Sequence, residues 1–177
     1  ICTKVSRKLH ALSRVSQFMP FDRRKELLNA FILSQFGYCP LVWMFHSRKL
    51  NHRINTLHER ALRILYQDNG SSFDTLLVKN ESFRIHERNV QTLAIELYKV
   101  RYGISPKIMS HVFPINMNSR YIGGNEFSSR NVKSVNYGTD SLSHLGPKIW
   151  KLVPLEWKQL SLSKFTKKIR KWKPPCP

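Results

Sequence analysis

The sequence predicts a mainly α protein, in which a helical bundle precedes a small C-terminal module of α+β or irregular structure. Apolar residues recur every three or four positions over most of the first 113 residues, which is the spacing of one buried helical face. Asn, Ser, Gly and Arg replace that pattern after Pro114. We therefore expect a helical domain over 1–113, a linker or mobile loop over 114–131, and a C-terminal module over 132–177.

The charge balance restricts the class of partner. The chain has 177 residues, with 30 Lys and Arg against 11 Asp and Glu, a net charge of +19 and a pI near 10.3. Such an excess repels itself and attracts polyanions, so nucleic acid is the expected partner. A generic basic protein, ribosomal or mitochondrial for example, is the alternative. No run of about twenty uncharged apolar residues indicates a membrane span.

Capping residues and helix breakers predict where the helices begin and end. Asp22, Ser47 and Ser82 are expected N-caps, Pro40 a break, and Gly103 a C-terminal stop. A weak alternation over 132–137 favours a short strand or hairpin. The expected helices cover 3–19, 23–38, 48–66, 73–78, 83–102, 107–112, 143–153 and 162–173.

The helix expected over 48–66 carries two stripes. Its apolar residues step by four, three, four and three positions, which predicts one buried face: Leu50, Ile54, Leu57, Ala61 and Ile64. Basic residues follow the same rhythm one position earlier and should form a second stripe that flanks the first: Lys49, Arg53, Arg60 and Arg63. Such a helix can pack on a core and still present a row of positive charge to a long anion.

The expected last helix is also basic. Phe165, Ile169 and Trp172 form a narrow apolar edge on a helix that contains no acidic residue. The residues predicted to contact nucleic acid here are Lys164, Lys167, Lys168, Lys171 and Trp172. Two interpretations of Trp172 stay open, docking on the core or stacking on an unpaired base or ribose. An anionic membrane surface would also suit this helix, but basic faces occur throughout the chain, which favours nucleic acid.

The residues that enzymes use are scattered. The chain has no adjacent pair of acids such as two-metal catalysis needs, no glycine-rich phosphate loop, and no His and Cys at metal-ligand spacing. We therefore expect no catalytic residue, no metal site and no cofactor in this chain. His52 and His58 should contact phosphate or solvent. Cys39 lies in an apolar run, which favours a buried and inert thiol.

Several segments together resemble one family, the non-LTR (LINE-type, jockey-like) retrotransposon reverse transcriptases. Residues 34–43, SQFGYCPLVW, are similar to the family's Y-C-x-x-V-W segment just past the polymerase palm. Residues 57–66, LHERALRILY, resemble its L-x-x-x-Q-x-R-A-x-R-x-I segment. Residues 137–154 are similar to its R-S-F-x-x-x-G-P-x-x-W-N-x-L-P stretch, and 161–174 continue the match. The order and spacing of these segments cover almost the whole chain.

The resemblance implies the thumb and C-terminal region of an RNA-directed DNA polymerase. In the family this region grips the template–primer duplex and element RNA during target-primed reverse transcription. The palm, with its paired aspartates and Mg²⁺, lies upstream and is not in this chain, so no activity is expected from the chain alone. The implied partners are RNA, DNA and that palm, with no membrane.

The implied location is the nucleus, with a cytoplasmic ribonucleoprotein stage also open. The alternatives are an inactive element remnant, a stand-alone basic structural or RNA-binding module, and a small independent nuclease.

Overall fold

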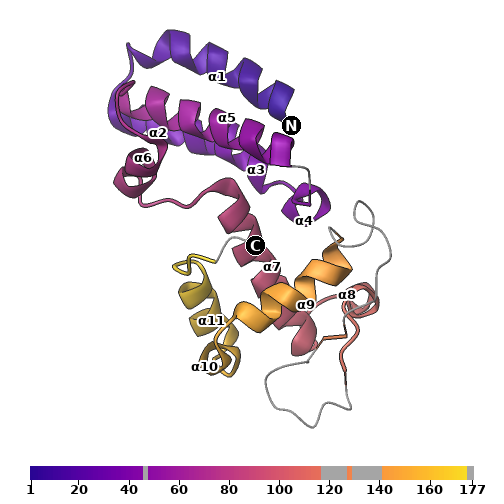
Figure 1. Ribbon diagram of the computed structural model, residues 1–177. Coiled ribbons are helices and arrows are strands. Elements are labelled where there is room, and N and C mark those ends of the chain that lie inside the picture. The colour runs from indigo at the N-terminus through magenta and orange to yellow at the C-terminus, as the bar shows by residue number, and fades with distance from the viewer. Residues whose placement is uncertain (46–47, 117–126, 129–140, 175–177) are drawn as a thin grey trace. The chain divides into compact units, whose positions relative to one another are not determined.

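The computed structural model describes residues 1–45, 48–116, 127–128 and 141–174, and these residues are mainly helical, as the sequence predicts (Figure 1). Within these ranges the only β pairing is an isolated antiparallel bridge between Ile115 and Phe127. The short strand or hairpin expected over 132–137 lies outside them. The chain forms two compact units, unit 1 over Ile1–His86 and unit 2 over Glu87–Pro177.

Unit 1 is built around two helices that lie side by side, α1 and α5 (Figure 1). Val5 and Leu9 of α1 and Ala61 and Leu65 of α5 are almost completely buried in its core. Shorter helices pack on this pair and close the core. The helices of unit 1 are α1 (Cys2–Ser16), α2 (Phe21–Leu27), the π-helix η1 (Leu28–Leu33), α3 (Ser34–Gly37), α4 (Pro40–Trp43), α5 (Arg48–Tyr66) and α6 (Phe73–Lys79).

The apolar segment that follows α1 is helical as expected, but its interior is a π-helix. Residues Leu28–Leu33 widen the helix, and the buried residues around this turn, Leu28, Ile32 and Phe36, lie four apart. Asp22 is not the N-cap, because Pro20 holds that position and makes no side-chain cap. Asp22 instead lies in the first turn of α2, where a carboxylate also interacts favourably with the helix dipole.

Pro40 ends the apolar helix as predicted, and the residues before it show how. Tyr38 is extended, and Cys39 adopts a left-handed conformation with φ 43°. Pro40 then begins α4, since its fixed φ and missing N–H suit a first helical position. Ser47, the expected N-cap of α5, lies outside the described residues.

Unit 2 contains nearly all of the long helix α7 and the helices that follow it. The bounds are α7 (Ile85–Arg101), α8 (Lys107–Val112), α9 (Leu142–Leu152), α10 (Leu155–Lys158) and α11 (Leu162–Ile169). The inward residues predicted for α7 are all buried: Ile85, Val90, Leu93, Leu97 and Val100. Gly103 takes up φ 67° beyond the end of α7, the conformation expected of a C-terminal stop.

Two sequence-based boundaries differ from the structure here. Ser82 does not cap α7, which begins three residues later, and the Ser82 hydroxyl has no hydrogen-bond partner within the described residues. The division into units falls between His86 and Glu87, not at the expected boundary after residue 113. The physical reason is that α7 packs on the C-terminal helices, since the hydroxyls of Tyr98 and Tyr102 donate to main-chain oxygens of residues 160 and 158.

A series of aromatic rings forms the core of unit 2. Phe165 of α11 stacks on Tyr98 with ring centroids 4.4 Å apart and tilts against Trp150 at 6.1 Å. Phe127 meets Trp150 edge to face at 5.7 Å, and Phe113 continues the series at 6.2 Å from Phe127. Ring pairs in these geometries contribute beyond the area they bury, so they hold α7, α9 and α11 together.

Gly146 in α9 should tolerate no side chain. A Cβ added there would lie 2.4 Å from Cε1 of Phe113, whose ring is fully buried. We expect Gly146→Ala to lower the free energy of unfolding by about 1–3 kcal/mol, even though Ala is the better helix former. Urea unfolding followed by circular dichroism measures this. Gly37→Ala is the control, because a Cβ at Gly37 meets nothing within 4 Å. Equal stability of both variants would contradict the prediction.

Candidate nucleic-acid interface

Helix α5 buries a broader face than its apolar pattern predicts. Ile54, Leu57 and Ala61 are buried as expected, whereas Leu50 is 44% exposed and Ile64 only half-buried. The additional buried residues are His58, Leu62 and Leu65. At about 100° per residue, the centre of the observed buried face is rotated by about 50° around the helix axis from the centre of the predicted apolar stripe.

The helices that cover α5 explain this rotation. Helix α1 packs along one side and α6 packs against another. On the α6 side the imidazole of His58 meets the ring of Phe73 edge to face, with centroids 5.5 Å apart. His58 was expected to contact phosphate or solvent, and the structure corrects this, because the residue is completely buried. His52, six residues earlier in α5, is exposed.

The rotated face leaves three of the predicted cations on the side of α5 that points away from the core. Lys49, Arg53 and Arg60 are exposed, and within the described part of the chain none of them makes an ion pair. By the same helical geometry they lie about 130° from the centre of the buried face, well round the helix from it, whereas the apolar pattern predicts a stripe that only flanks the buried face.

Arg63, the fourth predicted cation, is engaged in the local structure. Its Nη2 donates to Oε1 of Glu59 at 2.7 Å, and its Nη1 donates to the main-chain oxygen of Asn69 at 2.6 Å. The side chain is only 26% exposed. Arg63 therefore joins the last turns of α5 to the turn that follows and contributes less free charge than the other three.

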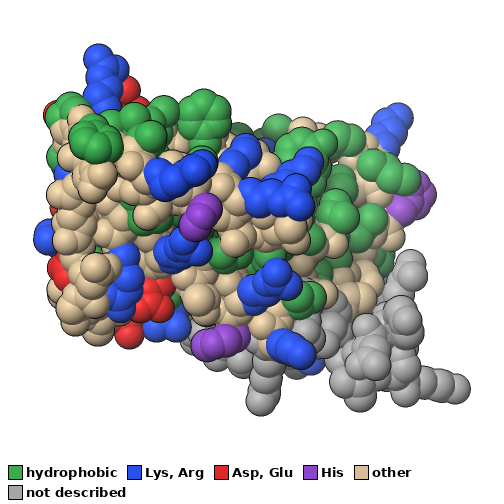
Figure 2. All heavy atoms as spheres, turned by 90° about the horizontal axis from the view of Figure 1, so that it is seen from above, with side chains coloured by type: hydrophobic (Ala, Val, Ile, Leu, Met, Phe, Trp, Pro, Cys, Tyr) green, Lys and Arg blue, Asp and Glu red, His purple; other side chains and the backbone are tan. Residues whose placement is uncertain are grey.

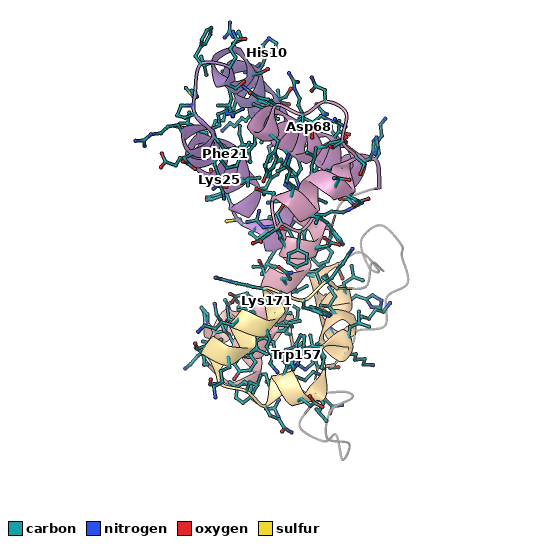
Figure 3. All side chains as sticks on the ribbon, turned by 90° about the vertical axis from the view of Figure 1, so that its left-hand side faces the viewer. His10, Phe21, Lys25, Asp68, Trp157 and Lys171 are labelled. Atoms are coloured by element: carbon teal, nitrogen blue, oxygen red, sulfur yellow. The ribbon has the colours of Figure 1, made fainter. Side chains whose placement is uncertain are left out.

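That turn is organised by Asp68, which lies at the end of α5 (Figure 3). Its carboxylate accepts the main-chain N–H groups of Gly70 and Ser71 at 3.0 Å and the Ser71 hydroxyl at 2.7 Å. Hydrogen bonds from the hydroxyl and main chain of Ser71, then that of Gly70, together with the charge of Lys79, lower the pKa of Asp68. Asp68 thus holds the carbonyl of Asn69 where Arg63 reaches it.

The predicted basic helix near the C-terminus is present but shorter than expected. Helix α11 ends at Ile169, and Lys171 and Trp172 follow it in a turn closed by hydrogen bonds to the carbonyls of residues 168 and 169 (Figure 3). Phe165 and Ile169 are fully buried. The four predicted lysines are all exposed: Lys164, Lys167, Lys168 and Lys171.

Two tryptophans accompany these lysines. Trp172 is half-buried, and its main-chain oxygen accepts a hydrogen bond from Nε2 of Gln91 at 2.6 Å. The residue is therefore anchored to α7 while part of it stays accessible, so the stacking of its ring on a base remains a prediction. Lys168 Nζ lies 5.6 Å from the ring centroid of Trp157, a cation–π contact that the sequence did not reveal.

The structure also shows basic residues that the sequence-based set omits. Lys158 is only 4% exposed, and its Nζ lies 4.9 Å from the ring centroid of Trp150. This lysine supports the aromatic core and is not a candidate contact.

Lys4, Arg7 and Arg14 on α1 are exposed and belong to unit 1 like the α5 cations. The recurrence of basic residues over 4–14 is the sequence signal that would have added these three residues to the predicted nucleic-acid contacts.

Cys39 and the acidic residues are the remaining candidates. Cys39 is exposed, not buried as expected, because the left-handed turn before Pro40 carries it outward. Among the residues that the structure describes, no group of three or more His, Cys, Asp or Glu side chains could hold a metal ion. No helix in the same residues is sufficiently long and apolar to cross a membrane.

The sequence and the structure were compared with known proteins, and no match was found. No protein-family model matches the sequence, and neither the curated proteins nor the solved structures yielded a match. The candidate interface therefore consists of two sets of exposed cations, the α5 set in unit 1 (Lys49, Arg53 and Arg60) and the α11 set in unit 2 (Lys164, Lys167, Lys168 and Lys171).

The lowered pKa of Asp68 predicts a pH-dependent contribution to stability. The pKa of Asp68 is lower in the folded state than in the unfolded state. Ionised Asp68 therefore stabilises the fold fully at pH values above the usual carboxyl pKa. This stabilisation is lost as the pH falls through the lowered pKa of the folded state. We expect Asp68→Asn to lower the melting temperature slightly at neutral pH and to match the unsubstituted protein in strong acid. Melting curves across acid pH test this, with Glu81→Gln, at an exposed position outside the helices, as a charge-matched control. A pH-independent difference would contradict it.

Proposed function

We propose that the chain is the nucleic-acid-gripping thumb and C-terminal region of a non-LTR retrotransposon reverse transcriptase, and that it binds template–primer duplex or element RNA. The observation that carries the proposal is the row of three exposed cations on α5, which make no ion pair with any residue that the structure describes. Burying an unpaired guanidinium or ammonium group is costly, so these cations stay in water. A row of such charges opposite a packed face supports contact with a long polyanion more than with a small ligand.

The length of the row suits a nucleic-acid backbone. Lys49 and Arg60 are eleven residues apart in one helix. At about 1.5 Å per residue the row spans about 16 Å, which equals the axial rise of about five base-pair steps of about 3.4 Å in a duplex. The α11 set offers a second cationic surface with aromatic rings beside it, a combination that also favours unpaired nucleotides.

Charge reversal on α5 is the direct test. We expect Lys49→Glu, Arg53→Glu and Arg60→Glu together to weaken binding to an RNA–DNA primer–template duplex by about tenfold or more, because a phosphate that is no longer neutralised keeps its counterions. The slope of log affinity against log salt should become shallower by about 0.9 for each such phosphate on B-form DNA, and by a comparable amount on the hybrid. Fluorescence anisotropy at several salt concentrations measures both quantities.

Matched controls separate this face from general charge. Arg7→Glu, Arg14→Glu and Lys25→Glu change the net charge of unit 1 equally, at exposed positions outside α5. The control variant should weaken duplex binding clearly less than the α5 variant does. An equal weakening would mean that net charge alone attracts the duplex and would reject the α5 face.

Reversal of Lys164, Lys167 and Lys171 tests whether the α11 set contributes separately. Failure of the unsubstituted chain to bind any nucleic acid near physiological salt would favour the inactive-remnant alternative.

The proposal includes no catalysis by this chain. In the family that it resembles, the palm supplies the carboxylates and Mg²⁺, and this chain would act with that palm on the same RNA and DNA in the nucleus. We expect no cleavage of labelled DNA or RNA and no incorporation of deoxynucleotides when the purified chain is incubated with Mg²⁺ or Mn²⁺. Metal-dependent cleavage that resists further purification would favour the independent-nuclease alternative.

A further inference from the structure

An open apolar groove in unit 1 is separate from the cation row of α5. It has a volume of about 330 Å³. One wall comes from α1, through Lys8, Ala11, Leu12 and Val15. The other comes from the segment of α2 and η1, through Leu27, Phe31 and Ile32.

The rim of the groove exposes large apolar side chains. Val15 is 42% exposed and Phe31 is 54% exposed. Lys8 contacts Phe31 across the groove, because its Nζ donates to the Phe31 carbonyl at 3.3 Å and lies 5.8 Å from the ring centroid. Phe31 also lies within the π-helix, and π-helical turns are frequently found at functional sites.

The charged side chains of the α1 wall are all positive. At about 100° per residue, Lys4 lies on the same side of α1 as Ala11 and Val15, and Arg7 and Arg14 lie along the outer edge of that side. No acidic residue precedes Asp22. The nearest acid of the opposite wall, Glu26, is in an ion pair with Arg23 at 2.8 Å. Figure 2, which looks onto α1, shows blue side chains spread across this face beside green ones, with red confined to the left.

We propose that this groove binds an acidic amphipathic helix of a partner protein. Apolar residues at i, i+3, i+4 and i+7 of such a helix would fill the groove, as in other helix-in-groove complexes. Asp and Glu beside that apolar face would meet Lys4, Arg7 and Arg14, which favours this partner over a basic or neutral one and speeds the encounter. Nucleic acid fits the groove itself poorly, because a phosphate there would exchange its water for aliphatic walls.

A designed peptide tests the proposal. The probe is a fluorescein-labelled helical peptide of about 18 residues, with Leu at the four spaced positions and Glu beside them. Its matched control has Lys in place of every Glu. We expect the acidic peptide to bind the full chain with a dissociation constant in the micromolar range, and the basic peptide to bind at least about tenfold more weakly. No measurable binding of the acidic peptide would overturn the proposal.

Two substitutions on α1 locate the binding surface. Ala11 lines the groove and is exposed, so Ala11→Glu adds bulk and negative charge there without disturbing the core. Ser13 is exposed on the far side of α1, and Ser13→Glu changes the net charge equally. We expect Ala11→Glu to weaken peptide binding by about tenfold or more and Ser13→Glu to change it by less than about twofold. Equal effects of the two variants would overturn the groove as the binding surface.

Other occupants give distinct results. If a second copy of the chain fills the groove, sedimentation velocity without peptide shows a dimer that Ala11→Glu dissociates, and the proposal is overturned. If duplex DNA fills it, Ala11→Glu weakens DNA binding more than Ser13→Glu does, and the proposal is again overturned. A monomer whose DNA affinity is equal in both variants, together with acid-selective peptide binding, supports it.

Discussion

Helix α5 is covered by α1, by α6 and by the segment of α2 and η1, and this packing decides where the charge of unit 1 can lie. An unpaired cation cannot follow the apolar residues into such a core without a large desolvation penalty. The chain has too few acids to pair with its cations inside, so Lys49, Arg53 and Arg60 occupy the one side of α5 left open to water. The basic surface is thus a consequence of how the core closes.

Unit 2 also presents exposed cations on a packed helix, but aromatic rings hold this helix in place. Helix α11 is short and highly charged, and an isolated helix of this length would not be stable in water. Phe165 anchors it by stacking on Tyr98 and by contact with Trp150, so aromatic packing keeps the surrounding lysines on a rigid support. A helix that is already formed spares the cost of ordering the backbone when the lysines bind a ligand.

The features that local spacing encodes were predictable from the sequence. The inward face of α7 and the turn at Gly103 follow from apolar periodicity and backbone preference, and both agree with the structure. Burial of His58 depends on Phe73, a residue on another helix, and no spacing rule within α5 contains that information. Ser82 does not cap α7, because the helix begins at Ile85, three residues beyond it. For the site, exposure of Lys49, Arg53 and Arg60 was predictable, whereas the groove required the packing of two helices.

The left-handed turn at Cys39 has a consequence for handling the protein. An accessible thiol oxidises in air and can join two chains through a disulfide, whatever their affinity for one another. Such a covalent pair would carry twice the positive charge and two copies of every surface. On a gel or in an anisotropy titration it would resemble tight, cooperative association, so a reducing agent belongs in every sample.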